Sequence, residues 1–169
     1  MSELTGTQQS FRAAMANLSA AVNVVSTDGP CGRAGMTVSA ACSVTDAPPT
    51  MLVCLNRASR SHGIVTGNGR LAVNVLADGQ EDLAMHFAGA TQVPTAERFD
   101  DAWDLDTHGV PVLRHAAAVV VGRIEAEQDL GSHTVLFVAV EHVRAHDDGG
   151  ALVYFRRRFH RVGADALIA

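Results

Sequence analysis

The sequence predicts a mainly β protein, folded as an antiparallel barrel with a few short helices packed outside it. Most of the strand-like segments follow one another directly, whereas a doubly wound parallel sheet would place a helix between successive strands. The motif G-x-G-x-x-G of the classical dinucleotide-binding fold follows none of the predicted strands. The 169 residues are enough to bury a core, and we expect a single domain over residues 1–169 with its core at about 11–160.

Three short segments have the apolar spacing of helices and are expected to pack outside the barrel. They are residues 8–18, 59–66 and 80–87. In the first of them, Phe11, Met15 and Leu18 fall on one apolar face. The second begins near Ser59 or Ser61, and serine is a residue type common at the N-cap of a helix.

About seven segments are predicted as strands, because they are rich in apolar and β-branched residues and are separated by turn-forming residues. They are residues 21–27, 35–45, 51–55, 71–76, 116–129, 134–145 and 151–155. The two longest are expected to form a hairpin through the turn Gly131-Ser132-His133. The stretch 88–111, which contains the only tryptophan, shows little regular pattern, and loops of that length are uncommon unless they serve as lids or packing arms.

The charge composition argues against several classes of partner. The chain carries 18 acidic and 13 basic side chains, a net charge of -5, and every basic residue is an arginine. A net acidic chain with one short basic run, Arg156 to Arg158, is a poor nucleic-acid binder. No apolar stretch approaches the roughly 20 residues that cross a bilayer, and the N-terminal residues lack the pattern of a secretory signal. We therefore expect a cytoplasmic protein with no nucleic-acid or membrane partner.

The cysteines and histidines do not predict a metal site. Cys31, Cys42 and Cys54 are odd in number and have no C-x-x-C spacing, which argues against a disulfide framework and a zinc site. The last two lie in apolar runs and are expected to be buried structural thiols. His142 and His146 could share a metal on a helix, but on the predicted strand they would lie about 13 Å apart.

One hydroxyl-rich segment, residues 37–45, is the most informative part of the chain. As a single strand it would place on one face the residues Thr37, Ser39, Ala41, Ser43 and Thr45. Small and hydroxyl side chains allow a flat ring system to approach the backbone closely and to be bound through its polar edge. The alternative interpretation is an ordinary solvated strand face, and the residues alone do not decide between the two.

Seven motifs, taken in order, resemble the flavin reductase domain family. They are F-R-x-A-M from Phe11, A-A-V-N-V-V from Ala20, G-M-T-V-S-A-x-C-S-V-T-D-x-P-P from Gly35, V-C-L-N-x-x-S from Val53, A-V-N-V-L from Ala72, G-S-H from Gly131 and L-V-Y-F-x-R-R-F-H from Leu152. Each motif is weak alone, but together they span nearly the whole chain. The resemblance is greatest to the branch that contains the reductase components of 4-hydroxyphenylacetate 3-monooxygenase, followed by the pyrimidine-utilisation flavin reductases.

The resemblance implies a split β-barrel of the FMN-binding type that binds flavin at a homodimer interface. It implies reduction of free FAD or FMN by NADH or, less favoured, NADPH, and diffusion of the reduced flavin to a separate oxygenase component. NADH is favoured because the chain shows no obvious basic pocket for a 2′-phosphate. The choice between FAD and FMN stays open. The open alternatives are a flavin carrier without turnover, an oxidase-type relative that retains its flavin, and a barrel without a ligand.

The resemblance also implies a set of cofactor-binding residues, carried over by position. They are Thr37, Ser39, Ala40, Ser43, Val44, Thr45, Asn56, Ser59, Phe87, Tyr154 and Arg158. The first three would line the ribityl chain and ring edge, the next three would contact the isoalloxazine, and Asn56 and Ser59 would hold the phosphate. His133 would be the catalytic residue, orienting the nicotinamide, because hydride transfer belongs to the cofactors. Simpler interpretations remain open: Ser59 as a helix N-cap, Asn56 as a turn residue and Phe87 as a core residue.

Overall fold

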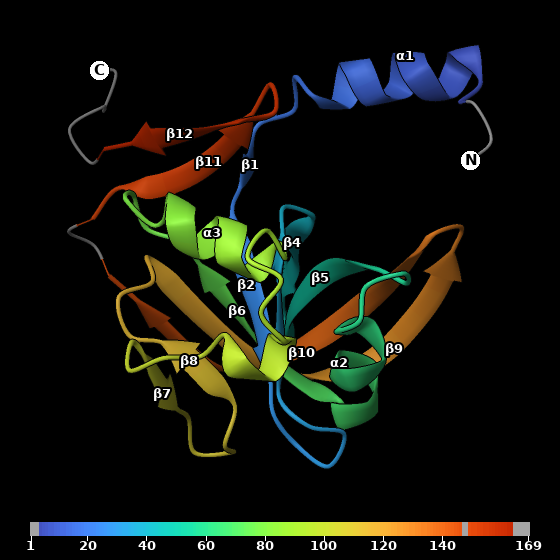
Figure 1. The fold of residues 1–169 in the computed structure, drawn as a ribbon. Helices are drawn as coiled ribbons and strands as arrows, with labels where there is room; N and C mark the ends of the chain where they lie inside the picture. Colours follow the sequence, from blue (N-terminus) through green and yellow to red (C-terminus); the bar gives the residue numbers. More distant parts are fainter. Residues whose placement is uncertain (1–3, 147–148, 164–169) are drawn as a thin grey trace.

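The computed structural model describes residues 4–146 and 149–163, which are mainly β structure with three α-helices (Figure 1). In chain order the elements are α1 (Gly6–Met15), β1 (Ala20–Ala21), β2 (Asn23–Thr27), β3 (Ala34–Val38), β4 (Ala41–Asp46), β5 (Pro49–Asn56), α2 (His62–Asn68), β6 (Arg70–Val75), α3 (Glu81–Phe87), a 3-10 helix (Thr95–Glu97), β7 (Trp103–Leu105), β8 (Pro111–Leu113), β9 (Ala118–Leu130), β10 (His133–Ala145), β11 (Ala151–Phe155) and β12 (Arg158–Val162). No helix in these ranges is long and apolar enough to cross a membrane.

Seven strands form one antiparallel sheet in the order β3-β2-β6-β9-β10-β5-β4. The sheet curves into a split barrel, and its two edge strands, β3 and β4, are consecutive in the chain. A smaller sheet of order β1-β11-β12 lies above the barrel in Figure 1, and β7 pairs with β8 near its lower end. The predicted fold class, a mainly β antiparallel split barrel with short helices, is confirmed.

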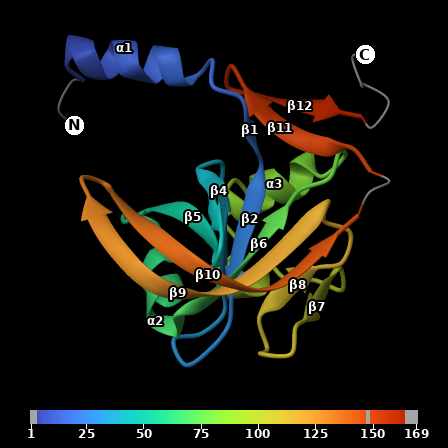
Figure 2. The ribbon, with the colours of Figure 1, turned by 180° about the vertical axis from the view of Figure 1, so that it is seen from behind.

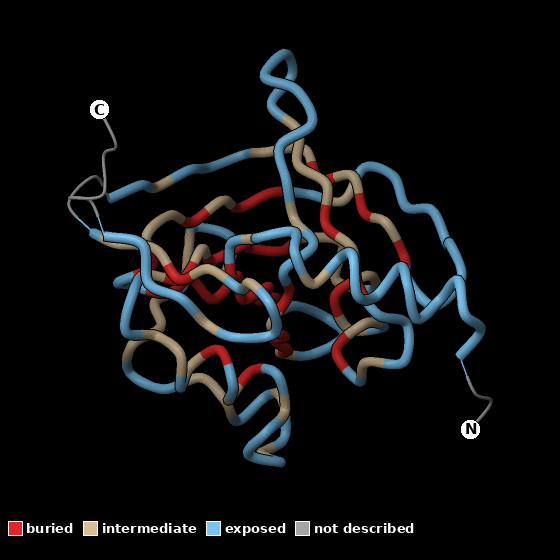
Figure 3. The backbone as a smooth tube through the Cα atoms, turned by 90° about the horizontal axis from the view of Figure 1, so that it is seen from above, coloured by how far each residue is buried: buried red, intermediate tan, exposed pale blue. Residues whose placement is uncertain are grey.

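Two clusters of buried apolar side chains hold the barrel together. One gathers around Phe87, Leu76 and Val112, and the other around Leu55 and Leu136. The buried parts of the chain lie on the inner strands, whereas α1 is exposed along its whole length (Figure 3). Truncating a fully buried leucine to alanine typically costs about 2–5 kcal/mol, so these clusters stabilise the curvature that brings distant strands together.

The long hairpin is confirmed, with shifted bounds. β9 and β10 cross the face of the barrel that is seen in Figure 2, and they pair along almost their whole length. Only Gly131 and Ser132 lie between the two strands, and Gly131 takes a left-handed conformation with φ 57°. His133 is therefore the first residue of β10, paired in register with Leu130 of β9 and Asn56 of β5, and not part of the turn.

The prediction of one continuous strand over residues 35–45 is wrong. The chain bends at Ser39 and Ala40, so that β3 pairs with β2 and β4 pairs with β5, at opposite edges of the sheet. A strand must change partner here to complete the curved barrel, and the small side chains at the bend permit that change of direction. Thr37 and Thr45 consequently do not share one strand face, and a register shift between Ser43 and Thr45 disturbs the alternation further.

The helices begin and end somewhat differently from the prediction. α1 begins earlier because Thr5 and Gln8 form a capping box, and it ends before Leu18. Its apolar face is not packed on the barrel, since Phe11 is 62% exposed and Leu18 is 66% exposed. α2 begins at His62, three residues after the start of its predicted range, and its N-cap is Ser61, one of the two serines expected there. α3 lies within one residue of its predicted range.

Two further expectations need correction. β12 was not predicted, because its hairpin turn with β11 is Arg156-Arg157, at φ 48° and 62°, and lacks the usual glycine or asparagine signal. Cys42 is exposed on the edge strand β4 and Cys54 is only half-buried, so neither is a fully buried thiol. Burial, followed by the neighbouring Cys42, raises the pKa of the Cys54 thiol.

The irregular stretch 88–111 contains the 3-10 helix and β7, and it acts as a packing arm. Trp103 lies with its ring centroid 5.2 Å from that of Phe87 and 4.9 Å from that of Phe99. These contacts fasten the stretch to the core beside α3. The segment between α3 and β7 is thereby held over one edge of β3, where it closes part of the candidate site.

Candidate functional site

Two cavities lie along β3 and meet at Thr37. The first, called the arginine cavity, has a volume of about 570 Å³. It is lined by Met36, Thr37, Asn56, Ala58, Ser59, Arg60, Ser61, Phe87, Ala88, Gly89, Gln92, Val93, Pro94, Thr95 and Arg98. The second, called the tyrosine cavity, has a volume of about 410 Å³ and shares Thr37 and Ala88 with the first. The two cavities are together called the groove, and the volume of each lies within the range usual for ligand-binding sites.

The arginine cavity has a positive lining. Arg60 and Arg98 both line it, and no aspartate or glutamate is among its lining residues in the described part of the chain. The guanidinium of Arg98 is held in place, because its Nε donates to the carbonyl of Val93 at 2.9 Å and its Nη1 to that of Phe87 at 3.2 Å. Burial, and then the positive charge of Arg60, lower the pKa of Arg98. Two neighbouring guanidinium groups fit an anion such as a phosphate.

The turn between β5 and α2 supplies polar groups to the same cavity. Asn56 Oδ1 accepts a hydrogen bond from the backbone N–H of Ala58 at 2.9 Å, and Ser59 Oγ accepts one from Ser61 at 3.2 Å. Ser61 Oγ in turn donates to the carbonyl of Gly35 at 3.1 Å, which fixes the turn against β3. Asn56 and Ser59 thus have turn-forming roles, while the N-cap of α2 is Ser61.

The tyrosine cavity is lined by Val22, Thr37, Val38, Ser39, Ala84, Met85, Ala88, Tyr154, Arg157, Arg158 and Phe159. The hydroxyl of Thr37 donates to the carbonyl of Ala84 at 2.6 Å, so its oxygen is left to accept a hydrogen bond from a ligand. Tyr154 and Phe159 pack edge to face, with ring centroids 5.4 Å apart. Phe159 offers the cavity an apolar ring and no hydroxyl.

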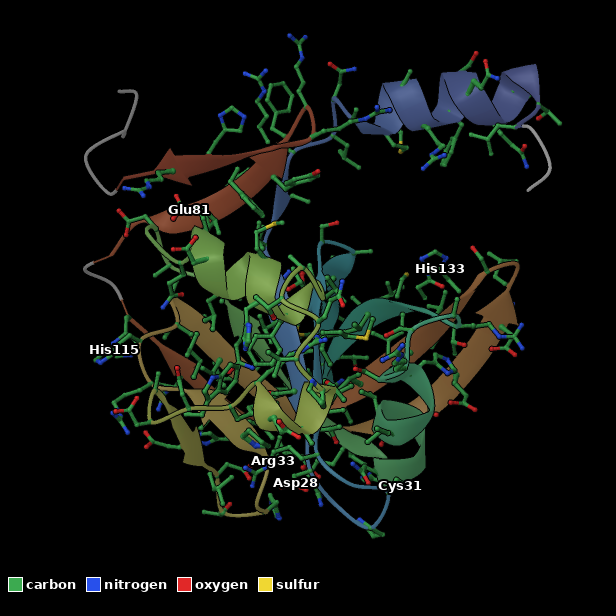
Figure 4. The ribbon with its side chains drawn as sticks, in the orientation of Figure 1. Asp28, Cys31, Arg33, Glu81, His115 and His133 are labelled. Carbon is green, nitrogen blue, oxygen red and sulfur yellow. The ribbon has the colours of Figure 1, made fainter. Side chains whose placement is uncertain are left out.

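His133 lies beside the turn of the arginine cavity. It is directly opposite Asn56 in the β5–β10 ladder, and residues opposite each other project to the same face of a sheet. Its ring Nδ1 lies 2.9 Å from Ser132 Oγ, which orients the imidazole while the side chain stays exposed. Figure 4 shows His133 at the end of the barrel away from Asp28, Cys31 and Arg33.

Some residues expected in the site lie elsewhere. Ala40, Ser43, Val44 and Thr45 are exposed at the bend and on the edge strand β4, and they line neither cavity. Phe87 does line the arginine cavity, but it is 1% exposed and its ring packs in the core, so its main contribution is to hold α3 in place.

Comparison with known proteins identifies the family. The model of the flavin reductase like domain matches residues 15–163. The chain belongs to the flavin reductase like family. The reductase component of 4-hydroxyphenylacetate 3-monooxygenase from Pseudomonas aeruginosa is 49% identical over 163 residues, which cover 96% of each chain. The FMN reductase (NADH) RutF of Stutzerimonas stutzeri is 49% identical over 154 residues, covering 90% of this chain and 87% of the relative.

Solved flavin reductase structures have the same fold. An NADH:FAD oxidoreductase of Streptomyces globisporus, in complex with NAD and FAD fragments, is 27% identical with a TM-score of 0.85, covering 98% of this chain and 99% of that one. The flavin reductase component of a bacterial two-component tryptophan halogenase is 26% identical with a TM-score of 0.85, covering 92% and 98%. The resemblance indicated by the sequence motifs is confirmed.

Among the lining residues that sequence reasoning missed in this flavin reductase are Arg60, Ser61 and Arg98. Arg60 and Ser61 lie in the same turn as Ser59, and their position inside that turn could have indicated them. Arg98 lies in the irregular stretch that follows α3, where no periodicity or motif signals its place. Only the packing of that stretch on the core brings Arg98 next to Arg60.

Proposed function

We propose that this flavin reductase oxidises NADH, reduces FMN or FAD, and releases the reduced flavin to diffuse to a separate oxygenase component. The observation that carries the proposal is the arginine cavity, whose lining has two guanidinium groups and no acidic side chain in the described part of the chain. Relatives that are named NADH-dependent FMN reductases and reductase components of a monooxygenase support the choice of nicotinamide and partner.

The residues present fit a flavin. Arg60, Arg98 and the turn hydroxyls would hold the phosphate, and the Thr37 oxygen would accept a hydrogen bond from the polar edge of the ring. Tyr154 and Arg158 of the tyrosine cavity would lie along the flat part of the cofactors. With both held there, NADH would supply a hydride and be converted to NAD⁺, and the flavin would accept the hydride together with a proton from solvent.

The work of the protein is then to hold two flat rings in contact. Well-oriented binding of two reactants lowers the barrier because it replaces a random encounter by a fixed approach. His133 would lie next to the nicotinamide, with its ring orientation set by Ser132. We assign it an orienting role, because the hydride passes directly between the cofactors and needs no side-chain base.

We further propose that the protein is a homodimer. Within residues 4–146 and 149–163 the apolar face of α1 has no cover, and Val44 on the edge strand β4 is 51% exposed. Exposed apolar patches of this kind mark interaction surfaces. The expected ring contacts at Ser43, Val44 and Thr45 would become enclosed only if a second copy covered this edge.

The test is an anaerobic assay with excess free flavin and NADH, followed at the flavin and nicotinamide absorbance bands. We expect many equivalents of flavin to be reduced per protein, with FMN and FAD ranked in the same experiment. His133→Ala should slow the reaction while leaving flavin bound. Binding followed by no more than one equivalent of reduction would instead support a carrier or a protein that retains its flavin.

A further inference from the structure

Four side chains join the turn that holds Asn56 to the hairpin that holds His133. Arg57 Nη2 lies 3.3 Å from Asp129 Oδ2, and Thr134 Oγ1 donates to Asp129 Oδ1 at 2.6 Å. His62 Nε2 lies 2.8 Å from the same Thr134 oxygen. Arg57, His62, Asp129 and Thr134 are together called the clamp. It links β9 and β10 to both ends of the segment that connects β5 to α2.

The direction of each hydrogen bond in the clamp follows from the groups involved. Thr134 donates its single hydroxyl proton to the Asp129 carboxylate, because an ionised carboxylate has no proton and can act only as an acceptor. The Thr134 oxygen is therefore an acceptor toward His62, and His62 carries a proton on Nε2. A threonine hydroxyl can both donate and accept in this way, whereas a valine at the same position can do neither.

Thr134 is the member of the clamp with the largest expected effect. Arg57 and Asp129 are 49% and 56% exposed in their side chains, so water weakens their ion pair and its contribution is small. Thr134 is 1% exposed, and water cannot readily replace the hydrogen bonds that it makes.

His133 is held between two fixed points. Before it, the carbonyl of Ser132 accepts a hydrogen bond from the backbone N–H of Arg57 at 2.9 Å. After it, Thr134 belongs to the clamp. The backbone of His133 is thus tied on both sides to the turn that lines the arginine cavity.

We propose that the clamp positions His133 relative to the flavin phosphate, and so sets the approach of the nicotinamide to the flavin ring. The proposal rests on the proposed function, which places the phosphate in the arginine cavity and the nicotinamide beside His133. Thr134 and His62 are positioning residues, since they act through His133 and the turn. A displacement of about 1 Å can slow a reaction by up to about a hundredfold, so loss of the clamp slows hydride transfer more than it weakens flavin binding.

The first experiment compares Thr134→Val with a matched control, Thr27→Val. Thr27 is also fully buried, and its Oγ1 donates to the carbonyl of Arg70 at 2.6 Å, on a different strand pair. We expect Thr134→Val to slow anaerobic single-turnover hydride transfer about tenfold while the Kd for FMN changes less than about twofold. Thr27→Val should leave both values within about twofold of wild type. Equal losses in the two variants would mean that a general loss of stability is responsible, and would overturn the proposal.

The second experiment adds Thr134→Val to His133→Ala. If the clamp acts through His133, the double variant is as slow as His133→Ala alone, because the same contribution is lost only once. If the fold-slowing of the double variant equals the product of the slowing in the two single variants, the two residues act independently and the proposal is overturned. Should Thr134→Val fail to fold, the pair His62→Gln and His62→Leu replaces it, and only the glutamine, which keeps an N–H donor, should retain most of the rate. A wild type without turnover contradicts the proposed function, whereas a fast wild type with an equally fast Thr134→Val contradicts the clamp alone.

Discussion

At the scale of residues, the site depends on positive charge with no acidic side chain among the described lining residues of the arginine cavity. Arg98 is fixed by two backbone carbonyls and faces Arg60, so the positive charge is in place before an anion arrives. Such preorganisation means that little conformational freedom is lost when a phosphate binds. The same arrangement is unfavourable in the empty protein, because like charges repel, and this is typical of a binding site.

We predict that Arg60→Gln weakens FMN binding about tenfold, because a hydrogen bond to a charged group contributes about 1.5–3 kcal/mol. Binding of riboflavin, which has no phosphate, should change little. Arg57→Gln is the matched control: it removes the same charge from the same turn, but Arg57 is paired with Asp129 and does not line the cavity. Fluorescence titration gives the Kd of FMN and of riboflavin for the wild type, Arg60→Gln and Arg57→Gln. An equal loss for FMN and riboflavin would contradict a phosphate contact.

At the scale of elements, the groove exists because β3 and α3 approach closely at Gly35. A side-chain Cβ at this position would lie 2.5 Å from Phe87 Cε1 and 3.0 Å from Phe99 Cζ. The carbonyl of Gly35 also accepts hydrogen bonds from Ser61 and Thr95, so that β3 connects the turn before α2 to the 3-10 helix. The position of the groove is therefore set by how closely these elements pack.

We predict that Gly35→Ala destabilises the protein by about 1–3 kcal/mol, the usual cost of overpacking a core. It should also weaken FMN binding, since displaced aromatic rings move α3 away from Thr37. Gly63→Ala is the control: the added Cβ meets no atom within 4 Å, and alanine favours the helix. Thermal unfolding and flavin titration of both variants test this, and an unchanged Gly35→Ala protein would contradict the packing argument.

At the scale of the whole molecule, α1 is the feature that the described part of a single chain does not explain. It has no buried residue, although Phe11, Met15 and Leu18 lie along one side of the segment. Its described hydrogen bonds to the body come from Arg156, whose backbone N–H donates to Ala16 and whose side chain donates to Asn17. As far as the described residues show, α1 is an arm held at its base, and this arrangement is understandable if its apolar side packs on a second copy.

We predict that the wild type has twice the chain mass of 17.8 kDa in solution and that Phe11→Glu lowers this mass toward one chain. Burying a charge without a partner in an apolar interface is strongly unfavourable. Ala13→Glu, which adds the same charge to an exposed position of α1 away from Phe11, should leave the dimer intact. Light scattering measures the molar mass in solution of the wild type, Phe11→Glu and Ala13→Glu. A wild type of one chain mass would contradict the dimer.

The sequence by itself determined the family, the fold class and most of the strands and helices of this protein. Those features follow from local signals: apolar alternation, turn residues at fixed places and motifs such as the one that ends in Ser59. The family resemblance of the motifs, and not periodicity, indicated Thr37, Asn56 and Ser59 as cofactor-binding residues, and all three line the arginine cavity.

Only the tertiary structure decided where the hydroxyl-rich segment divides, which residues supply the positive charge and how His133 is held. The segment over residues 35–45 divides because the barrel must curve, and curvature is a property of the whole sheet. Arg60 and Arg98 are 38 positions apart in the chain, and the packing of an irregular stretch brings them to one cavity. Contacts between residues so distant in the chain leave no periodic signal, because periodicity reports only the geometry of a single element.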